Sequence, residues 1–183
     1  LLGENGAGKS TMMKVLAGIY APDAGHIRYR GKEVTIPTPK AAQQLGISMI
    51  HQELNPMPHL TLAQNVFIGR EPRKTVGFWL DEKKLNAQTE ELFQSMRLTL
   101  EPRTKVADLT VAKQQMVEIA KAISYHSEVL IMDEPTAALT ESEIDELFNM
   151  IRQLRDRGVG IVYISHRLED TGNFDTRDLK NDP

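Results

Sequence analysis

Hydrophobic positions follow two different periods along the chain, which predicts strands that alternate with helices. Short apolar runs bounded by turn residues predict buried strands at 47–51, 129–132 and 160–165. Apolar residues at helical spacing predict amphipathic helices at 12–19, 81–96, 112–123 and 144–154. These helical stripes are expected to face the protein core.

Polar residues with capping chemistry indicate where two of the helices begin. Thr38 followed by Pro39 predicts a short helix that ends at Gly46, because proline suits the first helical position and glycine suits the residue after the last turn. Thr140 and Glu143 have the spacing of a capping box and predict the start of the helix that covers 144–154.

The order of the predicted elements indicates an α/β fold with a mainly parallel sheet. A hairpin is predicted from 26–30 and 33–36, with its turn at Gly31-Lys32. Residues 54–125 are mainly helical in pattern and interrupt the strands, so we expect them to form an inserted helical subdomain.

Residues 3–10 read Gly-Glu-Asn-Gly-Ala-Gly-Lys-Ser and match the phosphate-binding loop of P-loop NTPases. In such a loop the backbone N–H groups surround a polyphosphate, Lys9 reaches the β- and γ-phosphates, and the Ser10 hydroxyl holds Mg²⁺. The candidate nucleotide-binding residues are Gly3, Glu4, Asn5, Gly6, Ala7, Gly8, Lys9, Ser10 and Thr11. The alternative is a glycine-rich turn that only begins a helix.

Two acidic residues follow the predicted strand 129–132. Ligands of open α/β sheets bind at the carboxyl ends of the strands, so Asp133 is a candidate for holding Mg²⁺ through water. Glu134 is the candidate that orients and activates the attacking water. The alternative is a pair of acids that merely ends a strand, although the loop at residues 3–10 favours the functional interpretation.

Composition narrows the class of protein. The 183 residues are 40% hydrophobic, carry a net charge of −3 and include no cysteine, which excludes a disulfide framework. No cluster of lysine and arginine is interleaved with aromatic residues, so no nucleic-acid partner is expected. No apolar run has the length of a membrane span, and any membrane association is expected to come through a partner.

The run Leu-Thr-Val-Ala-Lys-Gln-Gln-Met-Val-Glu-Ile-Ala-Lys-Ala at 109–122 resembles the signature region of ATP-binding-cassette ATPases. The resemblance extends from Leu1 to about Asp170. It implies that Gln52 is the Q-loop glutamine, which touches Mg²⁺ and the attacking water and senses the membrane subunit. It also implies that His166 is the switch histidine that contacts the γ-phosphate. Without the family, each would be an ordinary polar group at the end of a strand.

The motifs at 47–54, 114–122 and 161–167 look like the first cassette of the double-cassette ATPases that energise bacterial importers of ribose, galactose and xylose. That resemblance implies hydrolysis of ATP with Mg²⁺ at the cytoplasmic face of the cell membrane. The implied partners are a second cassette, membrane permease subunits and, indirectly, a sugar-binding protein. It also implies an incomplete cassette at 1–170, with a catalytic core at 1–53 and 126–170, the helical subdomain at 54–125 and an irregular tail at 171–183.

The chain departs from the family at three places. The signature Leu-Ser-Gly-Gly-Gln is Leu-Thr-Val-Ala-Lys at 109–113, so Thr110 keeps a hydroxyl that suits a helix cap but both glycines are lost. The D-loop, usually Ser-Ala-Leu-Asp, reads Ala-Ala-Leu-Thr at 137–140. Both changes suit the double-cassette subtype, in which this signature faces the weaker nucleotide site. The tail at 171–183 has no amphipathic period.

Two other functions remain open from the sequence. The first is a truncated, catalytically silent fragment that at most binds a partner. Little of the chain precedes the loop at residues 3–10, and no aromatic residue that would stack on adenine is visible. A cassette ATPase acting on ribosomes or DNA is disfavoured by the net charge of −3.

Overall fold

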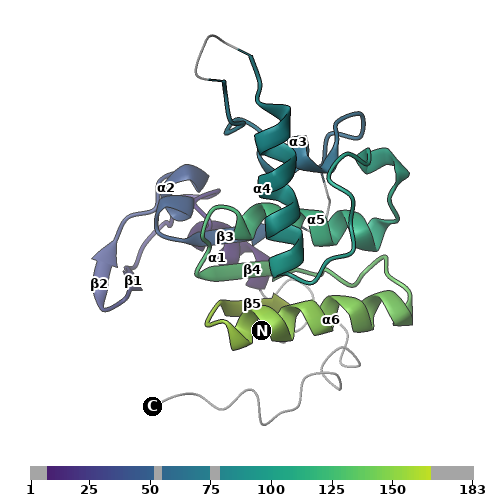
Figure 1. The fold of residues 1–183 in the computed structure, drawn as a ribbon. Coiled ribbons are helices and arrows are strands. Elements are labelled where there is room, and N and C mark those ends of the chain that lie inside the picture. Colours follow the sequence, from purple (N-terminus) through teal and green to yellow (C-terminus); the bar gives the residue numbers. More distant parts are fainter. Residues whose placement is uncertain (1–7, 52–54, 75–78, 166–183) are drawn as a thin grey trace.

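The computed structural model describes residues 8–51, 55–74 and 79–165, coloured along the chain in Figure 1. The helices are α1 (Lys9–Leu16), α2 (Pro39–Gln44), α3 (Leu62–Val66), α4 (Glu82–Ser95), the 3-10 helix η1 (Val106–Asp108), α5 (Val111–Ile123) and α6 (Glu141–Asp156). The strands are β1 (Ile27–Tyr29), β2 (Lys32–Val34), β3 (Ile47–Ile50), β4 (Val129–Asp133) and β5 (Gly160–Ile164). None of the helices within the described ranges has the length and apolar character needed to cross a bilayer.

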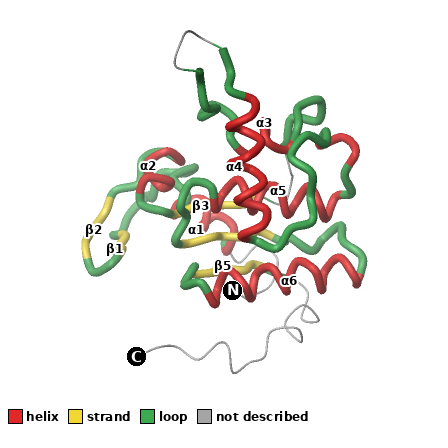
Figure 2. The backbone as a smooth tube through the Cα atoms, in the orientation of Figure 1, coloured by secondary structure: helices red, strands yellow, loops and turns green. Residues whose placement is uncertain are grey.

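A parallel sheet of three strands lies at the centre, in the order β3-β4-β5 (Figure 2). Ile50 is level with Met132, and Asp133 is level with Ile164, so the carboxyl ends of all three strands lie at one edge. β1 and β2 form a separate antiparallel hairpin. The predicted α/β architecture with a mainly parallel sheet is confirmed.

Alternate residues of the strands point into two different hydrophobic clusters. Leu130 and Met132 of β4 belong to the larger cluster, which also holds buried residues of α5 and α6, whereas Ile131 belongs to a smaller cluster with Met13 of α1 and Ala42 of α2. Successive side chains of a strand point to opposite faces of its sheet. The sheet is therefore covered on both faces, as its continuous apolar strands require.

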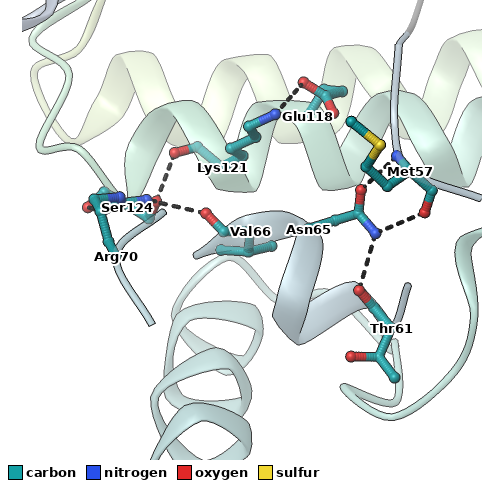
Figure 3. A network of polar contacts seen from close by, with 8 residues as sticks. All are labelled: Met57, Thr61, Asn65, Val66, Arg70, Glu118, Lys121 and Ser124. Atoms are coloured by element: carbon teal, nitrogen blue, oxygen red, sulfur yellow. Dashed lines mark hydrogen bonds and ion pairs between the residues drawn. The ribbon is translucent and has the colours of Figure 1, made fainter. Parts of the chain in front are cut away.

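Arg70 connects the turn after α3 to the end of α5, as Figure 3 shows. Its guanidinium donates to the Ser124 carbonyl at 3.0 Å and to the Ser124 hydroxyl at 2.6 Å. It also lies over the rings of Phe67 and Tyr125, 5.2 Å and 3.5 Å from their centroids. A second contact in the same view is made by Asn65, whose amide nitrogen donates to the Met57 carbonyl at 3.0 Å.

Local capping chemistry decides several helix starts as the sequence predicts. The Thr38 hydroxyl accepts a bond from the Ala41 N–H, with proline at the first position of α2. The capping box of Thr140 and Glu143 is also present at α6. A further capping box, Thr61 with Gln64, begins α3 and was not predicted, although its Thr-x-x-Gln spacing is visible in the sequence.

The hairpin turn lies one residue earlier than predicted. Tyr29 pairs with Lys32, so the two-residue loop is Arg30-Gly31 and not Gly31-Lys32. Both loop residues have positive φ, 53° and 74°, as the type I′ turn requires to match the twist of its strands. Glycine is therefore needed at the second loop position. β3 and β5 likewise end one residue before their predicted limits.

Among the described glycines, Gly18 should be the one that least tolerates a side chain. Its φ is +70°, and an added Cβ would lie 2.3 Å from the carbonyl oxygen of Thr38, which caps α2. Gly31 has a similar φ of +74° with no atom within 4 Å of an added Cβ. We expect Gly31→Ala to lower the free energy of unfolding by about 1 kcal/mol through backbone strain, and Gly18→Ala by about 3 kcal/mol or more. Equal losses in urea unfolding would show that the contact with Thr38 is unimportant.

The carboxylate of Glu143 makes stability depend on pH. Its pKa lies below the ordinary value chiefly because it accepts a hydrogen bond from the backbone N–H of Thr140, and further because of bonds to the Thr140 and Thr110 side chains. A lowered pKa in the folded state adds stability above the unfolded pKa, near 4.3, and that stability is lost as the pH falls through the folded value. The wild type should therefore be more stable than Glu143→Gln at pH 7, and the gap should close below about pH 4. Urea midpoints at a series of pH values measure this gap; one that does not change with pH would contradict the assignment.

Candidate functional site

The first turn of α1 combines a left-handed glycine with a buried lysine. Gly8 precedes the helix with φ +79°, and no atom of the described residues lies within 4 Å of where its Cβ would be. The left-handed backbone conformation therefore favours glycine here. Lys9 begins the helix and is only 8% exposed. A lysine is rarely so buried without a functional or structural reason.

Ser10 and Asp133 are brought together across 123 residues of sequence. The Ser10 hydroxyl donates to Asp133 Oδ1 at 2.8 Å, which joins the first turn of α1 to the carboxyl end of β4. Asp133 is only 7% exposed. Two of the candidate Mg²⁺ ligands predicted from separate motifs thus meet at one point.

The chemistry of this pair fits Mg²⁺ better than a transition metal. A hydroxyl oxygen and a carboxylate oxygen are hard ligands of the kind that Mg²⁺ prefers. In the described parts of the chain, no three histidine, cysteine or acidic side chains gather into a metal cage. Mg²⁺ in nucleotide sites takes one or two protein ligands and completes its shell with water and phosphate oxygens. Ser10 would supply a direct protein ligand, and Asp133 would hold the ion through water.

Glu134 has an unusual backbone conformation. Its φ is +47°, in the left-handed region that side chains other than those of asparagine and aspartate seldom adopt. Its N–H donates to the carbonyl oxygen of Ile164 in β5 at 3.0 Å, and the residue is half-buried. Backbone strain of this kind concentrates at functional sites. The sequence predicted Glu134 as a site residue, but nothing in it indicated this conformation.

Other candidate residues lie outside the described residues: Gly3, Glu4, Asn5, Gly6, Ala7, Gln52 and His166. Two of these positions follow strands that the structure describes. β3 ends at Ile50 and β5 ends at Ile164, on either side of β4 and at the same edge as Asp133. Gln52 and His166 each follow these last strand residues by two positions. Thr11 is described and lies in the first turns of α1, exposed on its surface.

The altered signature segment forms a helix start with a contact that the sequence did not reveal. The Thr110 hydroxyl accepts a bond from the Lys113 N–H at 3.4 Å, so its predicted capping role is confirmed. The side chain of Thr110 also helps to lower the pKa of Glu143, near the start of α6. Thr140, the last residue of the D-loop segment, caps that helix. Each of the two altered motifs therefore supplies the residue that begins a helix, Thr110 for α5 and Thr140 for α6.

A hollow of about 320 Å³ lies beside the carboxyl end of β3. Its lining includes His51 and Asn55, which flank the Gln52 segment, together with Glu118 and Lys121 of α5. Glu118 and Lys121 form an ion pair at 3.6 Å, drawn in Figure 3. The hollow thus lies between the edge of the sheet and α5, the helix that begins within the signature segment.

Comparisons with known proteins agree with this arrangement. The family model described as ABC transporter matches residues 1–137. The chain is 64% identical over 170 residues to a protein of Burkholderia cenocepacia (strain HI2424) named as a ribose/galactose/methyl galactoside import ATP-binding protein, and 53% identical to one of Geobacillus kaustophilus (strain HTA426) with the same kind of name. These matches cover 93% of this chain but only 33% and 34% of the relatives. The chain thus spans about a third of the length of these relatives.

Solved structures show the same fold. A nucleotide-free ATP-binding cassette from an ABC transporter superposes with a TM-score of 0.80 at 25% identity, covering 94% of this chain and 72% of that one. The ADP conformation of an ATP-binding cassette of an ABC transporter gives a TM-score of 0.79, also at 25% identity, with coverage of 94% and 71%. The Ser10–Asp133 contact joins the helix of the phosphate loop to the parallel sheet, as a nucleotide-binding fold requires. Because the family model also matches residues 1–137, the chain belongs to the ABC transporter family and has the P-loop NTPase fold of its ATP-binding cassettes.

Proposed function

We propose that this chain is the first ATP-binding cassette of a double-cassette ATPase that energises the import of a monosaccharide. The observation that carries the proposal is the hydrogen bond between Ser10 and Asp133, because it unites a phosphate-loop helix with an acidic strand end. The names of the relatives support a sugar of the ribose and galactose class.

The proposed mechanism is phosphoryl transfer by positioning and charge stabilisation. Backbone N–H groups of residues 3–8 and the ammonium group of Lys9 would hold the phosphates. Ser10, Gln52 and Asp133 would hold Mg²⁺, which supplies positive charge to the phosphate oxygens when bound.

The remaining candidate groups would act on the water and on the γ-phosphate. Glu134 follows Asp133 at the sheet edge, and its carboxylate would orient the attacking water and take its proton. His166 would donate a hydrogen bond to the γ-phosphate. The positions of β3 and β5 on either side of β4 support this division of roles, because they bring the chain to one edge of the sheet.

A second cassette is the first proposed partner. Family members pair the phosphate loop of one cassette with the signature of the other, and here the signature segment lacks both glycines. We propose that the loop at residues 3–10 faces an intact signature in the other half. The altered segment at Thr110 would then face a weaker nucleotide site.

Membrane permease subunits are the second proposed partner, at the cytoplasmic face of the cell membrane. The hollow beside β3 supports this, because His51 and Asn55 in its lining flank the Gln52 segment that would report the permease to the nucleotide site. A sugar-binding protein would be linked only through the permease.

Glu134→Gln should keep nucleotide affinity and stop turnover. The amide has nearly the same shape as the carboxylate but cannot accept a proton, so kcat should fall on the order of 10²-fold or more. Binding of MgATP by titration and single-turnover cleavage measure the two effects separately. Normal cleavage would show that Glu134 is a structural acid and that another group activates the water.

Hydrolysis should depend on the second cassette. Because a separate polypeptide segment is proposed to complete the site at Lys9 and Glu134, residues 1–183 alone should hydrolyse ATP slowly. Adding the second cassette of the same transporter should raise the rate, with a steeper than linear dependence on concentration. A catalytically silent chain would show no increase, and full activity of residues 1–183 alone would contradict the shared site.

A further inference from the structure

The turn that contains Glu134 is attached to β5 at two points. The Glu134 N–H donates to the Ile164 carbonyl at 3.0 Å. Two residues later, the hydroxyl oxygens of Thr136 and Tyr163 lie 3.1 Å apart. Neighbouring residues of one strand thus hold both ends of the three-residue turn 134–136.

The partner on the strand is itself firmly placed. Tyr163 is level with Met132 in the sheet, and its ring lies 5.6 Å from the ring of Phe148 in α6 at an angle of 34°. It packs against the larger hydrophobic cluster. Thr136 is only 2% exposed. The Thr136 side chain is therefore shielded from water, Tyr163 is half-buried, and a partly buried hydrogen bond of this kind is stronger than one in open water.

We propose that Thr136 and Tyr163 are positioning residues for hydrolysis, which hold the turn so that Glu134 keeps its left-handed backbone and its aim at the attacking water. A left-handed glutamate is strained and persists only where its surroundings determine it. The two attachments to β5 supply that determination. The inference rests on the role proposed for Glu134.

Two adjacent residues of β5, Tyr163 and Ile164, bind the turn that contains Glu134. β5 carries Tyr163 on one face, bonded to the turn, and Ile164 next to it, bonded to the Glu134 N–H. His166 follows two residues after Ile164 in sequence. A single strand thus fixes the backbone of Glu134 and leads into the candidate γ-phosphate residue.

The test uses variants that remove the hydrogen bond and keep the shape. In the assembled double cassette, Tyr163→Phe keeps the ring beside Phe148, and Thr136→Val keeps the volume of the side chain. Both should lower kcat about tenfold at unchanged KM and unchanged MgATP affinity, because misplacement of a reacting group affects the transition state. The double variant should be no slower than either single variant, and Thr136→Ser should restore kcat.

Thr89→Val is the matched control. Thr89 is fully buried, and its hydroxyl donates to the Leu85 carbonyl at 2.9 Å in α4, which does not contain a proposed site residue. The Thr89→Val variant loses a buried threonine hydroxyl, as Thr136→Val does, and should leave kcat unchanged. An equal fall of kcat in the control, or additive losses in the double variant, would overturn the proposal.

Amide hydrogen exchange tests the attachment without any activity. The exchange rate of the Glu134 amide should rise about fivefold in Tyr163→Phe and in Thr136→Val, and stay unchanged in Thr89→Val. If Glu134→Gln hydrolyses ATP normally, the role proposed for Glu134 fails, and amide exchange alone then decides whether the hydroxyl pair holds the turn. An unchanged exchange rate would contradict the proposal in either case.

Discussion

The structure depends on one contact above all, the hydrogen bond from the Ser10 hydroxyl to Asp133. It joins the start of the helix after the phosphate loop to the end of the central strand. The bond requires that β4 be held between β3 and β5, and that α1 pack on the sheet face where Met13 meets Ile131. The hydrophobic clusters on the two faces of the sheet thus bring a hydroxyl and a carboxylate to 2.8 Å from each other. This contact lies at the edge where ligands of such sheets bind.

Sequence reasoning succeeded where the signal is local. Thr38 with Pro39, and Thr140 with Glu143, begin helices through bonds that span three residues, and the structure shows both. The apolar runs correctly predicted the three parallel strands, because strands buried on both faces of a sheet have nearly continuous apolar sequences. That Ser10 and Asp133 lie close together could also be predicted, because the phosphate-loop motif and the acidic strand end each indicated binding of Mg²⁺.

What sequence could not predict depends on contacts between distant segments. The left-handed residue Glu134 donates its N–H to Ile164, thirty residues away, and no residue preference in the sequence points to this conformation. The hairpin turn was misplaced by one residue because Arg30 adopts a positive φ that arginine seldom takes. Gln52, His166 and residues 3–7 lie outside the described residues, so their roles stay predictions.

The altered signature has a physical reading in this fold. Glu143 accepts bonds from the N–H and the hydroxyl of Thr140, which hold its carboxylate at the first turn of α6, and the Thr110 side chain at the start of α5 helps to lower its pKa. Helix starts attract anions, and a phosphate brought to α5 would meet that carboxylate. Loss of the two signature glycines and the presence of Glu143 both disfavour the close approach of a phosphate to this helix start.

The central claim is that Ser10 and Asp133 form a metal site together with a bound nucleotide. Mn²⁺ can replace Mg²⁺ and be followed by electron paramagnetic resonance, which detects coupling of the metal to phosphorus. The account predicts a bound Mn²⁺ signal with phosphorus coupling in the presence of ATP, its loss in Ser10→Ala and Asp133→Asn, and its retention in the neighbouring control Thr11→Ser. A phosphorus-coupled Mn²⁺ signal that survives with both Ser10 and Asp133 replaced would contradict it.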